Sequence, residues 1–329
     1  MNILVTGGAG YVGSHVVREL METEHKIITV DNLQKGHRAA VMGGEFYCCD
    51  LGDKEALGKI FSRHSIDAVI HLAADSLVGE SVKAPQKYYQ NNICAGLILL
   101  EIMLKHDVNK LVYSSTAAVY GRPESIPIEE DDEKKPTNPY GRSKLFYEEI
   151  LEDYERGYDF DFISLRYFNA SGAHPSGEIG EDHQPETHLI PLILKTALGK
   201  RESLKIFGTD YDTRDGTCIR DYVHVSDLAG AHILAVEKLS RGGDSSVYNL
   251  GSGDGFSVRE VLETARSVTG CEIPAVPADP RPGDPPVLVA SSKKIKRKLG
   301  WKRNFADLEK IIETAWKWHK NNPGGFSSG

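Results

Sequence analysis

Short apolar runs alternate with amphipathic segments through the first half of the chain. The apolar runs predict strands at residues 3–6, 26–30, 45–49, 67–72, 110–114 and 161–167. Apolar positions at helical spacing lie between them and predict helices that include residues 12–21, 53–63, 92–105 and 140–155. Strands that alternate with helices indicate a parallel sheet covered on both faces, and right-handed crossovers make such a sheet doubly wound.

The second half of the chain is less regular. Residues 173–191 contain Gly, Pro, His and acidic residues with little periodicity, and a Pro-rich stretch follows at 274–286. Strands are predicted at 204–207, 247–250 and 287–290, and helices at 227–239, 258–268 and 305–320. We therefore expect an α/β fold with a doubly wound parallel (Rossmann) sheet in residues 1–172, to which about 218–250 return, and a smaller C-terminal α+β domain in residues 173–329. The second domain is expected to cap the carboxyl edge of the sheet, where open α/β sheets bind ligands.

Length and composition are typical of a globular protein with two domains. The chain has 329 residues, and domains average roughly 150 residues. Its 40% apolar and 26% charged residues exclude disordered, collagen-like and coiled-coil classes. A net charge of −8 gives no basic footprint for nucleic acid. The longest wholly apolar run, residues 93–100, is too short to span a bilayer, so no membrane partner is expected.

The cysteines argue against both a disulfide framework and a zinc–thiolate site. They are odd in number and form no CxxC pair: Cys48, Cys49, Cys94, Cys218 and Cys271. Reduced thiols are typical of cytoplasmic proteins, and no signal peptide precedes the first predicted strand. We therefore expect a cytoplasmic protein without a metal site.

A glycine-rich turn follows the first predicted strand directly. Residues 6–13 read TGGAGYVG, with glycines at 7, 10 and 13 before a predicted helix. In this context Gly7 permits the tight turn, Gly10 lets a pyrophosphate approach the backbone, and Gly13 lets the helix pack on the strand. The helix N-terminus then faces the phosphates. The motif predicts a dinucleotide-binding site.

Polar and small residues mark the carboxyl ends of the next strands. Asp31 ends the second predicted strand, 18 residues after Gly13, which is the usual place for an acid that binds the adenosine ribose of NAD. Its charge would repel a 2′-phosphate, so NAD is favoured over NADP. Asp50 and Leu51 follow the third strand at a position suited to the adenine, and the small residues 73–74 after the fourth let a cofactor lie close.

A tyrosine and a lysine stand four residues apart in Tyr140-Gly141-Arg142-Ser143-Lys144. On a helix that begins near Asn138 they share one face. A free tyrosine has a pKa of ~10 and is a poor base at neutral pH. An ammonium group and a cationic nicotinamide beside Tyr140 are expected to lower its pKa. Thr116, after the fifth strand, is placed to bond both Tyr140 and a substrate hydroxyl in a short proton relay.

With these motifs the chain resembles the UDP-glucose 4-epimerases (UDP-galactose 4-epimerases) of the extended short-chain dehydrogenase/reductase superfamily. The resemblance runs nearly from end to end. It is carried by Gly7–Gly13, Asp31–Leu33, His71–Ser81, Tyr88–Asn92, Ser114–Gly121, Pro139–Lys144, Leu165–Asn169, Gly172–Pro175, Arg220–Val225, Tyr248–Gly251 and Arg281–Asp284.

The resemblance implies roles for individual residues. Thr116, Tyr140 and Lys144 would form the catalytic triad. NAD would be bound by Gly7, Gly10, Tyr11, Val12, Gly13, Asp31, Asn32, Asp50, Leu51, Leu72, Ala73, Ala74, Asn91, Tyr140, Lys144 and Phe168. The UDP-sugar would contact Thr116, Tyr140, Asn169, His188, Leu189, Phe207, Arg220, Tyr222, Arg281, Asp284 and Leu288. Residues 1–172 would then be the NAD-binding domain and residues 173–329 the UDP-sugar-binding domain.

The implied reaction interconverts UDP-galactose and UDP-glucose, as in galactose metabolism, through a transient 4-keto sugar and NADH. A nucleotide-sugar 4,6-dehydratase would need a proton-transferring pair after Thr116, and this chain has Ala117-Ala118 there. A UDP-glucuronate 4-epimerase remains an alternative, and an NAD-sensing binding module is the non-enzyme alternative. Cofactor release during turnover, or the lack of turnover, would separate these classes.

Two positions bear on the details of the site. Ser76 stands where many members of the family carry a lysine near the nicotinamide, so that contact must be absent or replaced. Leu288 stands where a tyrosine is associated with rejection of N-acetylated sugars, so activity on UDP-GlcNAc and UDP-GalNAc is expected as well. The resemblance also implies a homodimer. The apolar positions in 92–105 and 144–151 either form a helical interface or belong to the core.

Overall fold

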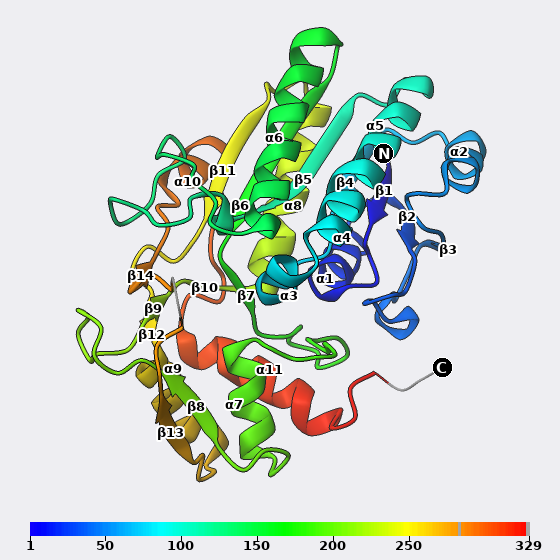
Figure 1. The fold of residues 1–329 in the computed structure, drawn as a ribbon. Coiled ribbons are helices and arrows are strands. Elements are labelled where there is room, and N and C mark those ends of the chain that lie inside the picture. The colour runs from blue at the N-terminus through cyan, green and yellow to red at the C-terminus, as the bar shows by residue number, and fades with distance from the viewer. Residues whose placement is uncertain (282–283, 327–329) are drawn as a thin grey trace.

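The computed structural model describes residues 1–281 and 284–326, so the predicted site motif at 281–284 lies partly outside the described residues. Its centre is a seven-stranded parallel sheet with the strand order β3-β2-β1-β4-β5-β6-β11 (Figure 1). Each strand pairs in parallel with its neighbours. The strands are β1 (Asn2–Thr6), β2 (Lys26–Asp31), β3 (Glu45–Cys48), β4 (Ala68–His71), β5 (Lys110–Thr116), β6 (Asp161–Tyr167) and β11 (Ser246–Leu250).

Helices cover both faces of this sheet, because its strands carry apolar side chains on both sides. Ile3 and Val5 face one core and Leu4 faces the other, all fully buried. The first core packs beneath α1 (Tyr11–Leu20) and α8 (Val225–Ser240), and the second beneath α2 (Lys54–Arg63), α5 (Ala95–Lys105) and α6 (Pro139–Gly157). The predicted doubly wound parallel fold is confirmed.

A smaller layer of helices and short strands lies at the carboxyl edge of the sheet, below it in Figure 1. Its own apolar core joins three helices to a parallel two-stranded sheet. These elements are α7 (Leu189–Ala197), α9 (Val258–Thr269), α11 (Leu308–Asn321), β8 (Leu204–Phe207) and β13 (Ala275–Ala278). Two small sheets connect this layer to the large one, β10-β7 and β12-β9-β14. Their strands are β7 (Asn169–Ser171), β9 (Ile219–Arg220), β10 (Tyr222–His224), β12 (Phe256–Ser257) and β14 (Val287–Leu288).

Four segments differ from the sequence prediction. The helix predicted at 92–105 begins as a π-helical turn, Gln90–Cys94, where the Asn92 side chain bonds the backbone of Asp75 instead of facing solvent. Helix α7 was missed because Pro191 lies in its first turns, a position that a helix tolerates. The Pro-rich stretch contains β13, which includes Pro277 at the edge of its sheet. The strand predicted at 287–290 shortens to β14.

Short elements complete the fold. They are α3 (Val78–Lys83), α4 (Pro85–Tyr89), α10 (Lys293–Leu299) and the 3₁₀ turns Arg38–Ala40 and Ala117–Val119. All five cysteines are free. No helix in the described part of the chain combines the length and the apolar character needed to cross a membrane.

Candidate active site

The glycine turn between β1 and α1 leaves its backbone open on one side. Gly7 has a φ of +72°, and a Cβ there would lie 2.5 Å from the backbone nitrogen of Ala73. A Cβ on Gly13 would lie 2.1 Å from the carbonyl oxygen of Gly7. Gly10 is the N-cap of α1, and no side chain caps the helix there. The free N–H groups of this helix end suit a pyrophosphate, so the residues present fit the dinucleotide cofactor that the motif predicts.

Carboxylates lie at the ends of the neighbouring strands. Asp31 Oδ2 accepts a hydrogen bond from Ala9 N at 3.0 Å, and its Oδ1 accepts one from Leu33 N at 2.8 Å. These bonds fix Asp31 against the glycine turn, while burial raises the pKa of its carboxyl group. Asn32 donates to Asp50 at 2.7 Å. The structure thus brings the predicted ribose-binding acid and the glycine turn together at one sheet edge.

The end of β4 continues this edge. Leu72, Ala73 and Ala74 are partly buried there, and Asn91 Nδ2 donates to Asp75 Oδ2 at 3.1 Å. Ser76 is exposed. Lys87 on α4 (Pro85–Tyr89) has its Nζ 3.2 Å from Asp75 Oδ1. Lys87 therefore brings a positive charge to the residue that precedes Ser76.

Thr116, Tyr140 and Lys144 meet where β5 ends and α6 begins; we call these three residues the β5–α6 corner. Asn138 caps α6 by accepting a hydrogen bond from Gly141 N at 2.9 Å, and Pro139 occupies the first helical position. A Cβ on Gly141 would lie 2.4 Å from the carbonyl oxygen of Ala118. Only glycine permits this close approach of α6 to the end of β5, and the approach brings Tyr140 to Thr116.

Burial dominates the electrostatics of the corner. Lys144 is 2% exposed, and its burial lowers its pKa to about 7. Its Nζ donates to the carbonyl oxygen of Ser114 at 2.8 Å and lies 4.8 Å from the centre of the Tyr113 ring. Burial raises the pKa of Tyr140, and a hydrogen bond with Thr116 opposes that rise. The expected lowering of the Tyr140 pKa is therefore not produced by the protein alone, because Lys144 is directed to a carbonyl and a ring face.

A buried ion pair that the sequence analysis missed supports this corner. Arg166 on β6 donates from Nε to both oxygens of Glu148 on α6, at 3.0 and 3.1 Å. Ser115 donates to the same carboxylate at 2.5 Å, and Arg166 also donates to the Tyr120 hydroxyl at 2.8 Å. The pair locks α6 to β5 and β6. The sequence signal that could have revealed this pair is Arg166 itself, a charged residue inside the apolar run 161–167.

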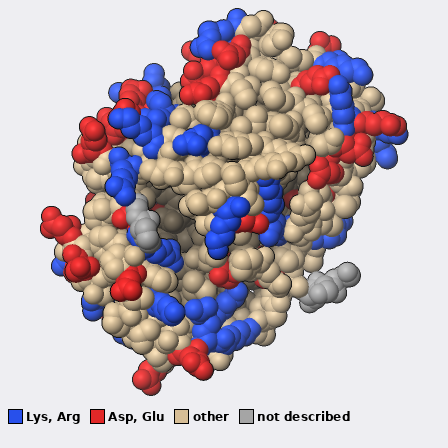
Figure 2. All heavy atoms as spheres, in the orientation of Figure 1, with Lys and Arg blue, Asp and Glu red and all other residues tan. Residues whose placement is uncertain are grey.

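Charged and aromatic side chains predicted to contact substrate contact one another in pairs; we call Phe207, Arg220, Arg281 and Asp284 the anchor site. Arg220 donates to Asp284 Oδ1 at 2.5 Å, and the Arg281 guanidinium lies 4.3 Å from the centre of the Phe207 ring. Figure 2 shows a hollow between the sheet and the smaller layer, with Lys and Arg side chains along parts of its rim. The structure thus groups residues that lie up to 77 positions apart in the sequence.

The other predicted substrate contacts, and Phe168 from the predicted NAD contacts, lie in three places. Asn169 and Tyr222 pair on β7 and β10, and Asn169 Nδ2 donates to the carbonyl oxygen of Asp221 at 2.8 Å. Phe168 and Leu288 pack against the buried cluster of Val119, Tyr120 and Ile128. His188 directs Nδ1 to Glu181 instead, at 2.7 Å, and Leu189 follows it at the start of α7.

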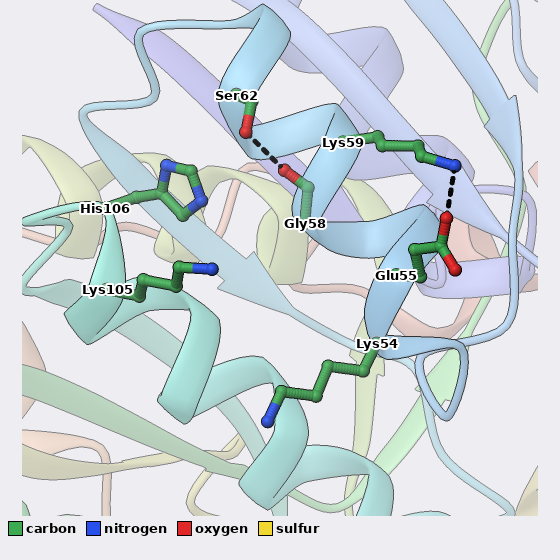
Figure 3. A pocket seen from close by; sticks show the side chains of 7 residues that line it. All are labelled: Lys54, Glu55, Gly58, Lys59, Ser62, Lys105 and His106. Atoms are coloured by element: carbon green, nitrogen blue, oxygen red, sulfur yellow. Dashed lines mark hydrogen bonds and ion pairs between the residues drawn. The ribbon is translucent and has the colours of Figure 1, made fainter.

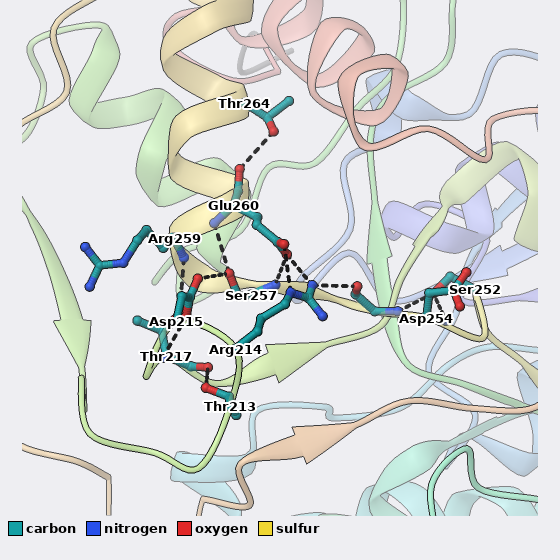
Figure 4. Close-up of polar contacts among 11 residues, drawn as sticks. Thr213, Arg214, Asp215, Thr217, Ser252, Asp254, Ser257, Arg259, Glu260 and Thr264 are labelled. Atoms are coloured by element: carbon teal, nitrogen blue, oxygen red, sulfur yellow. Dashed lines mark hydrogen bonds and ion pairs between the residues drawn. The ribbon is translucent and has the colours of Figure 1, made fainter.

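A polar network holds the loop that leads to Arg220 (Figure 4). Arg214 pairs with Glu260 at the start of α9, and its Nη2 donates to the carbonyl oxygen of Gly255 at 3.1 Å. Ser257 and Glu260 form a reciprocal capping box at that helix start. Asp215 accepts from Thr217 N at 2.8 Å. Arg214 therefore supports the loop through Glu260, whereas Arg220 belongs to the anchor site and pairs with Asp284.

A separate surface groove between α2 and α5 contains none of the predicted site residues. Figure 3 shows its lining: Lys54, Glu55, Gly58, Lys59, Ser62, Lys105 and His106. Its Lys59–Glu55 pair lies at 2.6 Å, with both side chains more than 70% exposed. Exposed ion pairs of this kind contribute little even to stability. Because the groove also contains none of the predicted site residues, we keep the candidate active site at the carboxyl edge of the sheet.

Comparisons with known proteins agree with this geometry. Residues 3–251 match the model of the NAD dependent epimerase/dehydratase family. A UDP-glucose 4-epimerase of Halalkalibacterium halodurans is 55% identical, over 100% of this chain and 98% of that protein. The structure of UDP-glucose 4-epimerase from Brucella ovis in complex with NAD is 44% identical with a TM-score of 0.94, covering 96% of this chain and 97% of that one. The UDP-Glc/GlcNAc 4-epimerase of Campylobacter jejuni is 42% identical with a TM-score of 0.86, covering 97% and 99%. This chain belongs to the NAD dependent epimerase/dehydratase family, and within it to the UDP-glucose 4-epimerases.

Proposed function

We propose that the protein is an NAD-dependent UDP-sugar 4-epimerase that interconverts UDP-galactose and UDP-glucose. The observation that carries the proposal is the β5–α6 corner, which accompanies two other features, the glycine turn and the anchor site. The first feature suits a dinucleotide and the second a nucleotide-sugar pyrophosphate. The corner itself contains a phenol, a hydroxyl and an ammonium group.

In this reaction the corner moves protons. The Tyr140 phenolate oxygen takes the proton of the sugar 4-hydroxyl, and Thr116 bonds both oxygens to keep the path short. NAD, when bound at the glycine turn and Asp31, supplies the hydride acceptor and donor and a positive ring charge beside Tyr140. That charge acts against the burial that raises the pKa of Tyr140. Lys144 remains fixed on the Ser114 carbonyl and orients the cofactor side of the corner.

The anchor site holds the UDP group while the sugar turns over. Guanidinium groups match phosphate oxygens in geometry and charge, which assigns Arg220 and Arg281 to the pyrophosphate. Arg220 is paired with Asp284 in the structure, so pyrophosphate binding must share or replace this pair. Asp284 would then lie free for the uridine ribose, with Phe207 and Tyr222 beside the base. A 4-keto sugar held only by UDP can present its opposite face, and the proton then returns from Tyr140.

Other reactions of similar enzymes fit less well. Dehydration across C5 and C6 needs an acid and a base after Thr116, and Ala117-Ala118 form a 3₁₀ turn there without any titratable group. A UDP-glucuronate 4-epimerase would use the same corner, so only an assay with UDP-glucuronate would distinguish it from the proposed enzyme. A purely NAD-sensing role leaves Thr116 and its hydrogen bond to Tyr140 without a purpose.

The small side chain at position 288 favours a second pair of substrates. Leu288 on β14 lies beside Arg220 in the strand register and packs against the Val119 cluster. Leucine leaves more room than tyrosine for an acetamide at the sugar C2. We therefore extend the proposal to UDP-GlcNAc and UDP-GalNAc, in agreement with the dual name of the Campylobacter jejuni relative.

The proposal includes a homodimer in the cytoplasm, where free thiols persist. Leu97 on α5 and Phe146 on α6 are 37% and 42% exposed, and these helices would pair with their copies. A Phe146→Glu variant is expected to run as a monomer in light scattering. The proposal also divides the chain as the sequence predicts, with residues 1–172 and about 218–250 binding NAD and the remainder of 173–329 binding the UDP-sugar.

Incubation of the purified protein with UDP-galactose tests the function. UDP-glucose should form without added NAD, because the cofactor returns to its starting state in each cycle and stays bound. Denaturation of the same preparation should release NAD rather than NADP, since Asp31 disfavours a 2′-phosphate. Predominant NADP, or product formation only with added NADP, would contradict the role of Asp31.

A further inference from the structure

Two histidines and two glutamates form a compact group in the irregular segment between β7 and α7. Glu181, His183, Glu186 and His188 each offer one ligand atom, and these atoms all lie within 4.8 Å of one another. We propose that this group, the Glu181–His188 cluster, binds one Zn²⁺ ion. The proposed zinc site shares His188 with the predicted UDP-sugar contacts, so its test reads metal content and thermal stability rather than turnover.

The separations between the ligand atoms match a tetrahedral zinc shell. The Nδ1 atoms of His183 and His188 lie 3.1 and 2.7 Å from Oε1 of Glu181. Glu186 adds Oε1 at 3.1 Å from His188 Nδ1 and Oε2 at 3.9 Å from His183 Nδ1. Zinc bonds of ~2.0–2.1 Å place tetrahedral neighbours about 3.3 Å apart. The observed separations lie on both sides of this value, so small side-chain adjustments would close the shell.

Glu186 points to a cation rather than to internal pairing alone. Its side chain is 3% exposed. Its Oε1 accepts hydrogen bonds from the backbone N–H groups of Thr187 and His188, at 2.7 and 2.8 Å. Its Oε2 is buried without a hydrogen-bond partner among the residues that the structure describes, and it faces the imidazole of His183. A buried carboxylate oxygen without a donor is costly, and a bound cation would satisfy it.

The chemistry of the four ligands selects among cations. Two imidazole nitrogens and two carboxylate oxygens suit Zn²⁺, whereas Ca²⁺ and Mg²⁺ prefer shells of oxygen alone. The carboxylates form a buried floor, because the Glu181 side chain is only 4% exposed, and the 45% exposed His188 leaves a path from solvent. Four protein ligands leave no open coordination position, which makes the zinc structural rather than catalytic.

Zinc at this place would hold together three parts of the fold. Trp318 on α11 donates from Nε1 to the carbonyl oxygen of Glu181 at 3.3 Å. The edge of the His183 ring meets the Tyr11 ring of α1, with centroids 6.1 Å apart. His188 is the N-cap residue of α7. The ion would therefore fix an irregular segment between the glycine-turn helix and the smaller layer, and with it the start of α7.

The test begins with full-length protein stripped of metal by a chelator and dialysed. Titration with Zn²⁺ against a chromophoric chelator, followed by metal analysis of the desalted protein, should give one zinc per chain. His183→Ala and Glu186→Gln should each weaken binding at least about 10- to 100-fold, the scale seen even for groups that only support a ligand. His174→Ala should bind as the wild type does, because His174 lies in the same segment but pairs with Ser176.

Thermal unfolding provides the second readout. Added Zn²⁺ should raise the melting temperature of the wild type and of His174→Ala, and should not raise that of the two cluster variants. Glu186→Gln keeps the shape of the side chain, so it carries the test if His183→Ala does not fold. Failure of the wild type to bind zinc, or equal binding by wild type and cluster variants, would overturn the proposal.

Discussion

The β5–α6 corner and the anchor site are held in place in different ways. In the corner, Lys144 is 2% exposed and α6 is locked to the sheet by the Glu148–Arg166 pair. In the anchor site, the side chains of Arg220 and Asp284 are 14% and 28% exposed, and their main polar partners are each other. A rigid, buried corner suits proton transfer, and an adjustable charged pair suits capture and release of UDP. The contrast predicts that substitutions in the corner act on kcat and that those in the anchor site act on KM.

The largest expected effect comes from removing one oxygen atom in the corner. Tyr140→Phe should fold and retain NAD but lose at least ~100-fold in kcat, the usual scale for a lost general acid–base. Tyr113→Phe is the matched control, because the Tyr113 hydroxyl is buried without a hydrogen-bond partner in the described structure. The control should turn over within about threefold of the wild type. Steady-state rates on UDP-galactose measure both, and a kcat within threefold of wild type for Tyr140→Phe would remove the tyrosine from the mechanism.

In the anchor site, Arg220→Gln should raise KM for UDP-galactose by roughly 10- to 150-fold and change kcat less, because a charged hydrogen bond contributes ~1.5–3 kcal/mol. Arg214→Gln serves as the control, since Arg214 binds Glu260 and supports the same loop from outside the site. A loss confined to kcat in Arg220→Gln, or an equal rise of KM in both variants, would show that the contrast between the two regions is wrong.

Leu288 tests the wall between the two regions. The wild type should act on UDP-GlcNAc, and Leu288→Tyr should lower kcat/KM for the N-acetylated pair relative to the plain pair by roughly 5- to 150-fold, the scale of ~1–3 kcal/mol of overpacking. Comparison of the two substrate pairs in both proteins measures the ratio. An unchanged ratio would mean that Leu288 only fills the core beside Val119.

The last expected effect is a pH dependence of stability, which is small over any one pH unit. Lys144 has a pKa of about 7 in the fold against an ordinary value of 10.5. Between these values the unfolded state holds a proton that the folded state lacks, so stability rises with pH, by at most about 1.4 kcal/mol per pH unit. Below about pH 7 both states are protonated, and the cost of burying the charge is fully present.

Urea unfolding of wild type and Lys144→Met, at matched cofactor content, isolates this group. The stability advantage of Lys144→Met should be greatest near pH 7 and should shrink as the pH rises toward about 10. Parallel stability curves for the two proteins across that range would show that Lys144 is not buried as a low-pKa amine.

Prediction from sequence succeeded where the determinants are local. The spacing of Tyr140 and Lys144 on one helix face and the run of β6 at residues 161–167 depend on neighbours within a few residues. The π-helical turn at Gln90–Cys94 depends instead on Asn92 reaching Asp75 and Ser143, contacts that no local pattern encodes. The raised pKa of Tyr140 likewise follows from burial, which spacing alone does not reveal.

The Glu181–His188 cluster shows the same limit at a site. Its four residues are close in the sequence, but their spacing matches no familiar ligand motif. The cysteine pattern also argued against a metal site. The feature that distinguishes the cluster is the burial of the Glu186 side chain. Burial depends on the tertiary structure and cannot be read from local spacing. The anchor site similarly required the family resemblance, since Arg281 reaches Phe207 and Arg220 reaches Asp284 only in the folded chain.

The central claim is that the sugar is oxidised and reduced within one site, with proton transfer by Tyr140. UDP-galactose deuterated at C4 tests it most directly when the purified protein is incubated without added NAD. The account predicts UDP-glucose that retains deuterium at C4, at a rate at least ~100-fold higher for wild type than for Tyr140→Phe. Loss of the deuterium from the product, or a requirement for stoichiometric added NAD, would contradict it.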